Sequence, residues 1–310
     1  MAIETFHTLI ARNKRNSFAI IAVFLLFFVA IGMLIGWVWG GTWAFSVVVA
    51  CVAAIVAFLL TLMSYYSGSS AILSISKAKQ LQKSDDPQLF NVVEELTIAG
   101  GVPMPKIYVI DDTAPNAFAT GRNPQHAVVA ITTGLRQKLN RDELQGVMAH
   151  EISHVRNYDI LFAMLMAVMV GVLVMLCDVF LRSLWFGGGR RRRRSSREGG
   201  NPLEIILVIV AIVLAIVAPI LARIIQMTMS RQREYLADAS AIELTRNPEG
   251  LASALSRISN DPEVLEVANR ATAHLYIAHP IKKFEKRASS IFDTHPPIKD
   301  RIRRVLSLTT

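Results

Sequence analysis

Four apolar blocks divide the sequence. The first covers residues 18–39, which carry no charge, and the second covers residues 43–63 and follows after three intervening residues. Because about 20 consecutive apolar residues in a helix are enough to cross a bilayer, these two blocks predict a hairpin of transmembrane helices. The third block, residues 160–177, and the fourth, residues 205–222, each contain 18 uncharged residues and lie near the lower length limit for crossing.

Basic residues near the blocks predict the orientation in the membrane. Six of them flank the first hairpin at its two ends: Arg12, Lys14, Arg15, Lys77, Lys79 and Lys83. By the positive-inside rule, these residues place both ends in the cytoplasm. Five arginines at 190–194 separate the later blocks, in a loop that is either simply solvated or binds anionic lipid. Two alternatives stay open for those blocks: both cross the bilayer, or they form a hairpin that enters it or packs beside it without crossing.

The remaining segments have the pattern of a soluble domain in two parts. Residues 80–99 predict a helix, and residues 106–111, 116–120 and 127–132 are short β-rich runs that predict a small antiparallel sheet. Residues 223–310 show a helical pattern with many charges and no β-rich run. The predicted fold class is therefore a mostly α-helical membrane protein with a cytoplasmic α+β domain.

The blocks and the soluble segments together predict four parts. Residues 1–63 form the N-terminal transmembrane hairpin, and residues 64–158 form the first part of the soluble domain. Residues 159–222 form a second apolar hairpin with the arginine-rich loop, and residues 223–310 complete the soluble domain. A hydrophobic content of 52% and a mean hydropathy of +0.39 agree with this division, since an ordinary soluble chain is less apolar.

Composition limits the chemistry that the chain can carry. Cys51 and Cys177 both lie inside apolar blocks, so they offer neither a disulfide framework nor a thiolate metal site. A metal ion must then be held by histidine and carboxylate, which suits a catalytic zinc better than a structural one. The net charge of +9 comes largely from residues near the apolar blocks, which favours an anionic membrane surface as partner over nucleic acid.

One predicted helix, residues 141–157, carries the candidate chemistry. It contains His150, Glu151 and His154 in the order His-Glu-x-x-His, and Asn140 is expected to cap it. Residues four apart lie on one face of a helix, so both imidazoles can reach one metal ion. Glu151 can then reach a water bound to that ion, which is the arrangement of a zinc hydrolase with a glutamate general base.

A catalytic zinc needs a third protein ligand from elsewhere in the chain. The extended motif with a third histidine is excluded, because Asn157 and Ile160 occupy the positions where it requires glycine and histidine. Glu234 is the best candidate, and Asp238, four residues later on the same helical face, can accept the outer N–H of a ligating histidine. The alternative is that both carboxylates pair with nearby arginines on a solvated surface.

At this point the sequence resembles a known family, the HtpX zinc endopeptidases of bacterial membranes, which are gluzincins related to the CAAX prenyl endopeptidases. The resemblance covers nearly the whole chain and rests on the paired N-terminal spans and four motifs. These motifs are DDTAPNAFATGRNP (111–124), LNRDELQGVMAHEISHVRNYD (139–159), REYLADASA (233–241) and THPPIKDRI (294–302). The resemblance implies a zincin-like catalytic domain that binds one Zn²⁺ per subunit.

The resemblance also implies roles for individual residues. His150, His154 and Glu234 correspond to the zinc ligands and Glu151 to the general base. Four further residues are expected to form an edge strand along the cleft, to which an extended substrate adds by backbone hydrogen bonds; they are Asn116, Ala117, Phe118 and Ala119. The alternative for these four is an ordinary core strand. His295 is a candidate for a transition-state contact, with a structural or surface role as the alternative.

The leading hypothesis is a zinc-dependent metalloendopeptidase of the bacterial cytoplasmic membrane, with its active site facing the cytoplasm. The resemblance implies that it degrades misfolded or damaged membrane proteins in a stress response. Its expected partners are membrane-protein and unfolded polypeptide substrates, the lipid bilayer and other membrane quality-control proteases. The alternative hypothesis is a membrane scaffold with a structural zinc site. A transporter has little support, because no pair of broken helices is evident.

Overall fold

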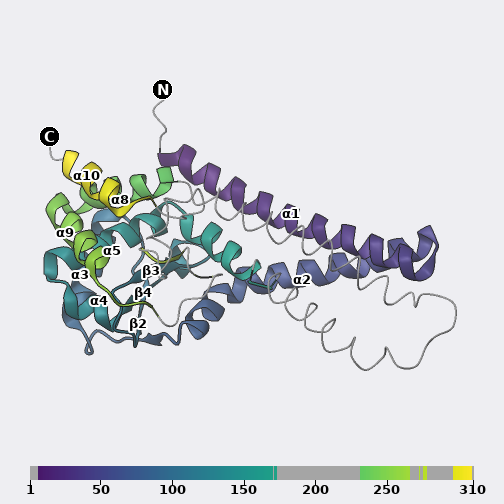
Figure 1. Cartoon of the computed structure of the whole chain (residues 1–310), viewed down its shortest axis with the longest axis horizontal. Helices are drawn as coiled ribbons and strands as arrows, with labels where there is room; N and C mark the ends of the chain where they lie inside the picture. Colours follow the sequence, from purple (N-terminus) through teal and green to yellow (C-terminus); the bar gives the residue numbers. More distant parts are fainter. Residues whose placement is uncertain are drawn as a thin grey trace. The chain divides into compact units, whose positions relative to one another are not determined.

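The computed structural model describes residues 6–169, 171–172, 231–265, 272, 275–277 and 296–308. The arginine-rich loop, the fourth apolar block, part of the third block and His295 lie outside these residues. The chain separates into two compact units (Figure 1). One contains Met1–Ser17, Tyr66–Ala167 and the described residues of Gln226–Thr310, and the other contains Phe18–Tyr65.

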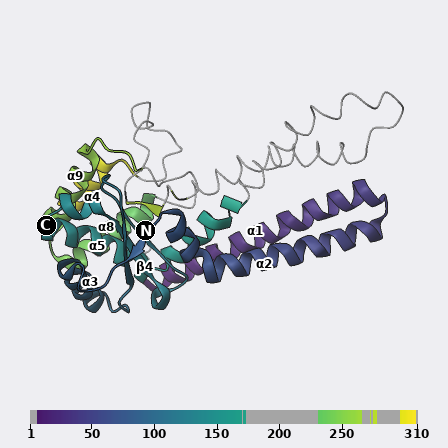
Figure 2. The ribbon, with the colours of Figure 1, turned by 90° about the horizontal axis from the view of Figure 1, so that it is seen from below.

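The second unit consists, in its described part, of two long helices. Helix α1 (Phe6–Gly40) and helix α2 (Trp43–Ile75) contain the candidate spans Asn13–Trp37 and Trp43–Ile75, with mean hydropathies of 3.1 and 2.8. Most of each span is exposed, with 11% and 22% of the most apolar stretch buried, as expected for helices that face lipid. Figure 2 shows them running side by side in opposite directions.

Two glycines let the backbones of α1 and α2 approach closely. A Cβ atom on Gly36 would lie 2.5 Å from Ser46 Cα, and one on Gly32 would lie 2.8 Å from Ala50 Cα. Small residues four apart are typical of helix pairs in membranes, where tight van der Waals packing replaces the hydrophobic effect. The local sequence of both helices therefore favours the predicted hairpin.

The other unit contains a four-stranded sheet in the order β1-β2-β4-β3. The strands are β1 (Lys79–Gln80), β2 (Lys106–Ile110), β3 (Ala117–Thr120) and β4 (Val128–Thr132). The predicted fold class is confirmed, but the sheet is mixed rather than wholly antiparallel, because β2 and β4 are parallel. The reason is that β3 begins at the end of the sheet where β2 stops, and β4 then returns between them. Hydrophobic alternation does not reveal such an insertion.

Besides the ends of α1 and α2 and the apolar helix Asp159–Met169, which begins in this unit, six α-helices and one short 3₁₀-helix are described here. They are α3 (Pro87–Gly100), η1 (Pro124–His126), α4 (Thr133–Lys138), α5 (Arg141–Arg156), α8 (Arg231–Thr245), α9 (Pro248–Asn260) and α10 (Ile298–Ser307). The helix expected over residues 80–99 starts later than predicted. Asp86 caps it by accepting from Leu89 N–H, and Pro87 occupies its first turn, where proline is favoured.

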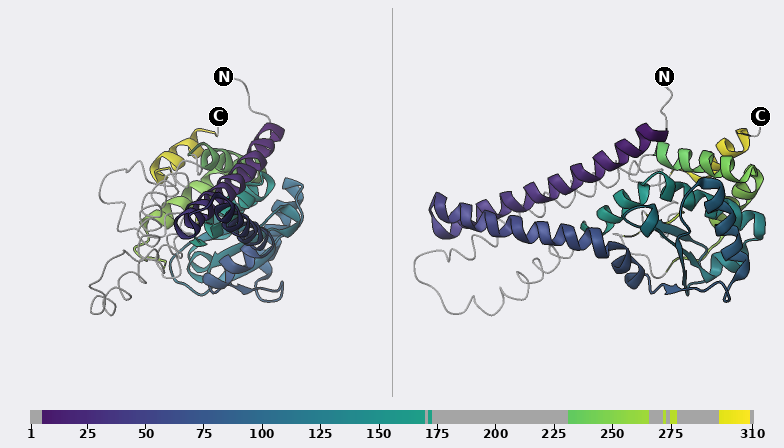
Figure 3. Two further views of the ribbon diagram at one scale, coloured as in Figure 1. Left: turned by 90° about the vertical axis from the view of Figure 1, so that its right-hand side faces the viewer. Right: turned by 180° about the vertical axis from the view of Figure 1, so that it is seen from behind.

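Helix α5 lies at the centre of this unit. Its start is held by a capping box, in which Asn140 accepts from Glu143 N–H and the Glu143 side chain accepts from Asn140 N–H. The helix packs against α3, α8, α9 and β3 (Figure 3), and a Cβ atom on Gly146 would lie 2.7 Å from Leu251 N in α9. Because α5 is almost entirely buried, the side chains that it presents are held rigidly by the core.

Candidate metal centre

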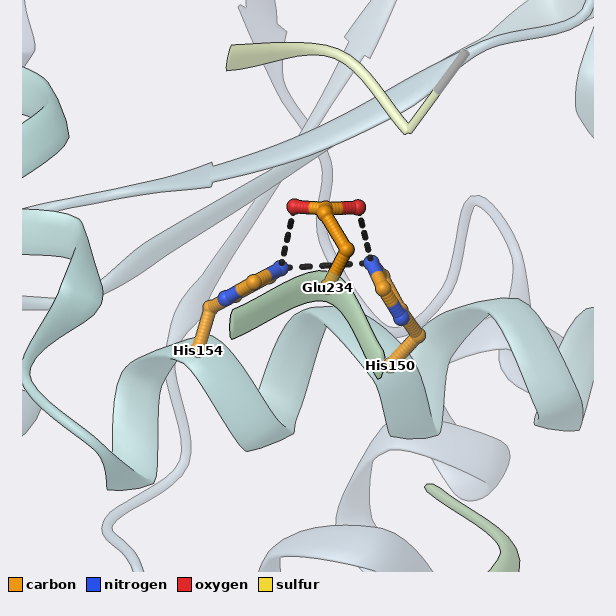
Figure 4. A group of neighbouring side chains, drawn as sticks. All are labelled: His150, His154 and Glu234. Carbon is orange, nitrogen blue, oxygen red and sulfur yellow. Dashed lines mark hydrogen bonds and ion pairs between the residues drawn. The ribbon is translucent and has the colours of Figure 1, made fainter. Parts of the chain in front are cut away.

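Two histidines on α5 and one glutamate on α8 converge on a single point. Nε2 of His150 and Nε2 of His154 are 3.2 Å apart, and each lies 3.7 Å from one carboxylate oxygen of Glu234. Figure 4 shows both rings pointing from α5 toward the Glu234 carboxylate. One ligand atom from each of the three residues can be chosen so that all lie within 4.8 Å of one another. The geometry therefore brings together three side chains that lie far apart in the sequence.

The donor set fits a catalytic zinc ion. Zinc in proteins takes imidazole nitrogen and carboxylate oxygen at about 2.0–2.2 Å, so the ligand atoms of a tetrahedral site lie about 3.3 Å apart. The observed separations of 3.2 and 3.7 Å are close to that value. Three protein ligands leave a fourth position for water or substrate, which distinguishes catalytic from structural sites.

Each histidine has a carboxylate at its outer nitrogen. Asp238, on α8, lies with Oδ1 2.9 Å from His150 Nδ1, and Asp159 lies with Oδ2 3.1 Å from His154 Nδ1. A carboxylate that accepts the Nδ1 proton leaves the Nε2 lone pair to face the metal, and it raises the basicity of the ring. Sequence reasoning assigned this position to Asp238 but missed Asp159, which ends the second quoted motif.

Arg301, on α10, was also missed, and it has no exposed surface. Its guanidinium donates from Nε and Nη2 to the two oxygens of Asp238, at 2.9 and 2.7 Å, and from Nη1 to the carbonyl of Ile277 at 2.9 Å. Burial alone would raise the pKa of Asp238, but the charge of Arg301 holds it at about 2. The bidentate pair fixes the carboxylate that orients His150. The fourth quoted motif contains this arginine, but spacing alone did not connect it with the metal site.

The electrostatics of the site suit proton transfer and cation binding. Burial raises the pKa of Glu151 to about 7, and the nearby Glu234 carboxylate adds to the rise. A group with a pKa near neutrality can both accept and return a proton. Burial would lower the pKa of His154, but the hydrogen bond to Asp159 and the charge of Glu234 raise it to about 9. The negative surroundings that favour a proton there also favour a divalent cation.

An open pocket with about 450 Å³ of empty space adjoins these groups. It is lined by the three ligands and Glu151, by Ala119 of β3, and by residues 275–277. Its walls combine apolar side chains with a few converging polar groups, as is usual for substrate sites. The pocket therefore gives a substrate access to the metal ligands.

The four residues expected along the cleft differ in their surroundings. β3 is an edge strand of the sheet, as expected, but Asn116 precedes it and its carbonyl accepts from Thr132 N–H. The carbonyl of Ala117 accepts from Ile277 N–H at 3.0 Å, and the fully buried ring of Phe118 packs edge-on against Tyr276. Of the four, Ala119 is the one that lines the pocket.

A buried His-Glu-x-x-His helix with a downstream glutamate, joined to two helices that can span a membrane, defines a membrane metalloprotease. The chain matches Peptidase family M48 over residues 83–309. It is 41% identical over 297 residues to the protease HtpX homolog of Lactobacillus helveticus, covering 96% of this chain and 97% of that one. It is 44% identical over 307 residues to the protease HtpX homolog of Dictyoglomus turgidum, covering 97% and 94%.

The chain therefore belongs to peptidase family M48. Among solved structures, S. mikatae Ste24p aligns with 81% of this chain and 57% of its own length, with a TM-score of 0.48 and 21% identity. Family membership confirms the resemblance drawn from the motifs, and it confirms a metalloprotease over a membrane scaffold.

Proposed function

We propose that this protein is a zinc-dependent endopeptidase of the bacterial cytoplasmic membrane that cleaves misfolded or damaged membrane proteins at their cytoplasmic face. The observation that carries the proposal is the convergence of His150, His154 and Glu234 beside the buried carboxylate of Glu151. In this assignment the first three residues hold one Zn²⁺, and Glu151 is the catalytic base.

The chain's own residues supply the proton transfers. A zinc ion held by the three ligands would make a water molecule more acidic and polarise the scissile carbonyl. Glu151 accepts the proton of the attacking water and then delivers it to the leaving amine, which requires a carboxyl group with a pKa near the working pH. The backbone N–H of Ala119 donates to Glu151 and so restrains the carboxylate beside the pocket.

The substrate is proposed to bind as an extended strand beside β3. Backbone groups of alternate residues in an edge strand point to the same side, so Ala117 and Ala119 both present theirs toward the pocket side. Because the Ala117 carbonyl already accepts from Ile277, we assign substrate pairing to the carbonyl of Ala119. An added strand gains affinity mainly from backbone hydrogen bonds, which suits a protease that acts on many unfolded sequences.

The membrane location and the biological role rest on sequence properties. Two candidate spans support membrane insertion, and the basic residues at both ends of the hairpin support a cytoplasmic active site. The proposed role in a stress response is an expectation that comes from the resemblance of the quoted motifs to HtpX-type proteases. Cooperation with other membrane quality-control proteases belongs to the same proposal.

The decisive experiment compares the full chain in detergent with its Glu151→Gln variant. Glutamine keeps the size of the side chain but cannot accept a proton, so zinc content should stay at one per chain while cleavage of an unfolded test protein falls by about 10²–10⁴-fold. Chelation of the metal should abolish the activity of the wild type. Undiminished cleavage by Glu151→Gln would remove Glu151 from the mechanism.

A further inference from the structure

Asn13, on the first turns of α1, makes a buried contact with the metal centre. Its side-chain amide donates from Nδ2 to Asp159 Oδ1 at 2.6 Å and to the carbonyl of Asn157 at 2.9 Å. Asn13 is 3% exposed and belongs to the same compact unit as α5. The other oxygen of Asp159, Oδ2, lies 3.1 Å from His154 Nδ1. A chain of two contacts therefore connects helix α1 with a proposed zinc ligand.

The orientation of the Asn13 amide follows from its neighbours. One of the two groups within reach of Nδ2 is the backbone carbonyl of Asn157, which can only accept, so the NH₂ end of the amide must face it and Asp159. A buried carboxylate oxygen without a donor would be costly, and a charged acceptor strengthens the bond. Asn13 is therefore a donor to Asp159 and is more than a space-filling residue.

The backbone conformation next to Asp159 explains why the two hydrogen bonds from Asn13 are needed. Helix α5 ends at Arg156, Asn157 caps it, and Tyr158 then adopts a left-handed conformation with φ of 61°. This conformation reverses the chain so that Asp159 returns to His154, and it is costly for a bulky L-residue. Asn13 holds the residues on both sides of the reversal, and Lys14 Nζ lies 4.3 Å from the centre of the Tyr158 ring.

We propose that Asn13 is a positioning residue of the metal centre. It fixes Asp159, and Asp159 in turn orients His154, so that the start of a membrane helix forms part of the support of the zinc site. Arg233 Nη1 lies 3.7 Å from the same oxygen of Asp159, so the carboxylate keeps one charged neighbour when Asn13 is changed. The loss should accordingly be partial. The proposal rests on the zinc ligand set of the proposed function.

The test measures zinc affinity of the full chain in detergent by competition with a chromogenic chelator, using zinc alone as probe. Asp159→Asn should weaken zinc binding by about 10–100-fold, the usual effect of losing an outer partner of a ligand. Asn13→Leu keeps the branched shape of the side chain but removes the donor, and it should weaken binding by a smaller factor, about 3–10-fold. Ser17→Ala is the matched control, because Ser17 bonds only the carbonyl of Asn13 in its own helix among the described contacts.

A double variant separates positioning from general stability. If Asn13 acts through Asp159, then Asn13→Leu should cause no further loss of zinc affinity in the Asp159→Asn background. Visible absorption of the cobalt-substituted protein should shift in Asn13→Leu and stay unchanged in Ser17→Ala, because the spectrum reports ligand geometry.

The possible contrary results are distinct. Wild-type zinc affinity in Asn13→Leu, or an equal loss in both backgrounds, overturns the role of Asn13 while leaving the proposed function intact. A wild-type chain that binds no zinc, or binds it unchanged after His154→Ala, overturns both proposals.

Discussion

The two histidines of the candidate metal centre differ in how their carboxylate partners are held. Nδ1 of His150 contacts Asp238, and the buried guanidinium of Arg301 donates to both oxygens of that carboxylate. Nδ1 of His154 contacts Asp159, which accepts from the neutral amide of Asn13. The first arrangement is a fully buried ion pair with two parallel hydrogen bonds. In the second, one neutral hydrogen bond from Asn13 is joined by the more distant charge of Arg233, whose Nη1 lies 3.7 Å from the same oxygen, and Asp159 keeps 11% of its side chain exposed.

This difference between the two carboxylates predicts different effects of mutations on folding stability and on zinc binding. A buried charge that loses its partner is strongly destabilising, because water cannot reach it. Asp159 should lose less when its neutral donor is removed, because Arg233 remains 3.7 Å from the same oxygen. We therefore expect changes on the His150 side to affect both folding and zinc binding, and changes on the His154 side to affect mainly zinc binding.

The largest effect is expected from Asp238→Asn. This change removes the bidentate carboxylate partner of the buried Arg301 and leaves only Glu234, whose Oε2 lies 3.5 Å from Nη1, so it should lower the free energy of unfolding by about 3–5 kcal/mol. The measurement is the thermal midpoint of the detergent-solubilised chain, together with zinc content. A midpoint within a degree of the wild type would show that Arg301 finds compensation elsewhere.

Arg301→Lys should have the next largest effect. Lysine keeps the charge but offers a point-like donor in place of a planar fork, so it cannot bond both oxygens of Asp238 and the Ile277 carbonyl in the same geometry. We expect a loss of about 1–3 kcal/mol of stability and weaker zinc binding. Arg303→Lys on the same helix is the matched control, since the Arg303 side chain is 80% exposed and should tolerate the change.

Asp159→Asn tests the His154 side of the metal centre. Zinc affinity should fall by about 10–100-fold, while the thermal midpoint measured in the presence of chelator should fall much less than in Asp238→Asn. Equal losses of stability in the two variants would contradict the distinction between the two sides of the centre.

The smallest effect is expected away from the site, at Asp86. The Asp86 carboxylate pairs with Arg136, at 3.1 Å between Oδ1 and Nη2. Burial alone would raise the pKa of Asp86, but the hydrogen bonds from Arg136 and from Leu89 N–H lower it below 3.8. Asp86→Asn keeps the helix cap and removes the charge, so it should cost about 1 kcal/mol or less at pH 7. Zinc affinity should not change.

The sign of the pH dependence follows from the lowered pKa. The contribution of the Asp86 charge is fully present above pH 3.8 and is lost as the pH falls through the lower pKa of the folded chain. The stabilities of wild type and Asp86→Asn should therefore converge in acid. A difference that grows below pH 3.8 would contradict this account.

Local patterns predicted the parts of the molecule that depend on neighbouring residues. The two spans follow from uninterrupted apolar runs, and the start of α5 follows from Asn140 and Glu143, three residues apart. The spacing of His150 and His154 requires a shared helical face, which the structure shows. Strands β2, β3 and β4 were located to within a residue, because β-rich runs lie between turn residues, whereas the two-residue strand β1 was missed.

Contacts between segments that are distant in the sequence could not be predicted from local patterns. The order of the strands depends on β4 returning between β2 and β3, and Ile277 donates to the Ala117 carbonyl although the two residues are far apart in the sequence. Neither feature leaves a periodic signal, since both arise from how whole elements pack. Of the four residues expected along the cleft, Ala119 lines the pocket, and their contact with a substrate stays a prediction.

The sequence by itself determined the apolar hairpin, the His-Glu-x-x-His helix and the identity of the groups that converge at the candidate metal site, because helical periodicity and residue chemistry are properties of short segments. Only the tertiary structure decided which neighbours hold those groups in place. Asn13 and Asp159 are 146 residues apart, and Asp238 and Arg301 are 63 apart. Burial makes both contacts energetically important, and burial exists only after α1, α5, α8 and α10 have packed together.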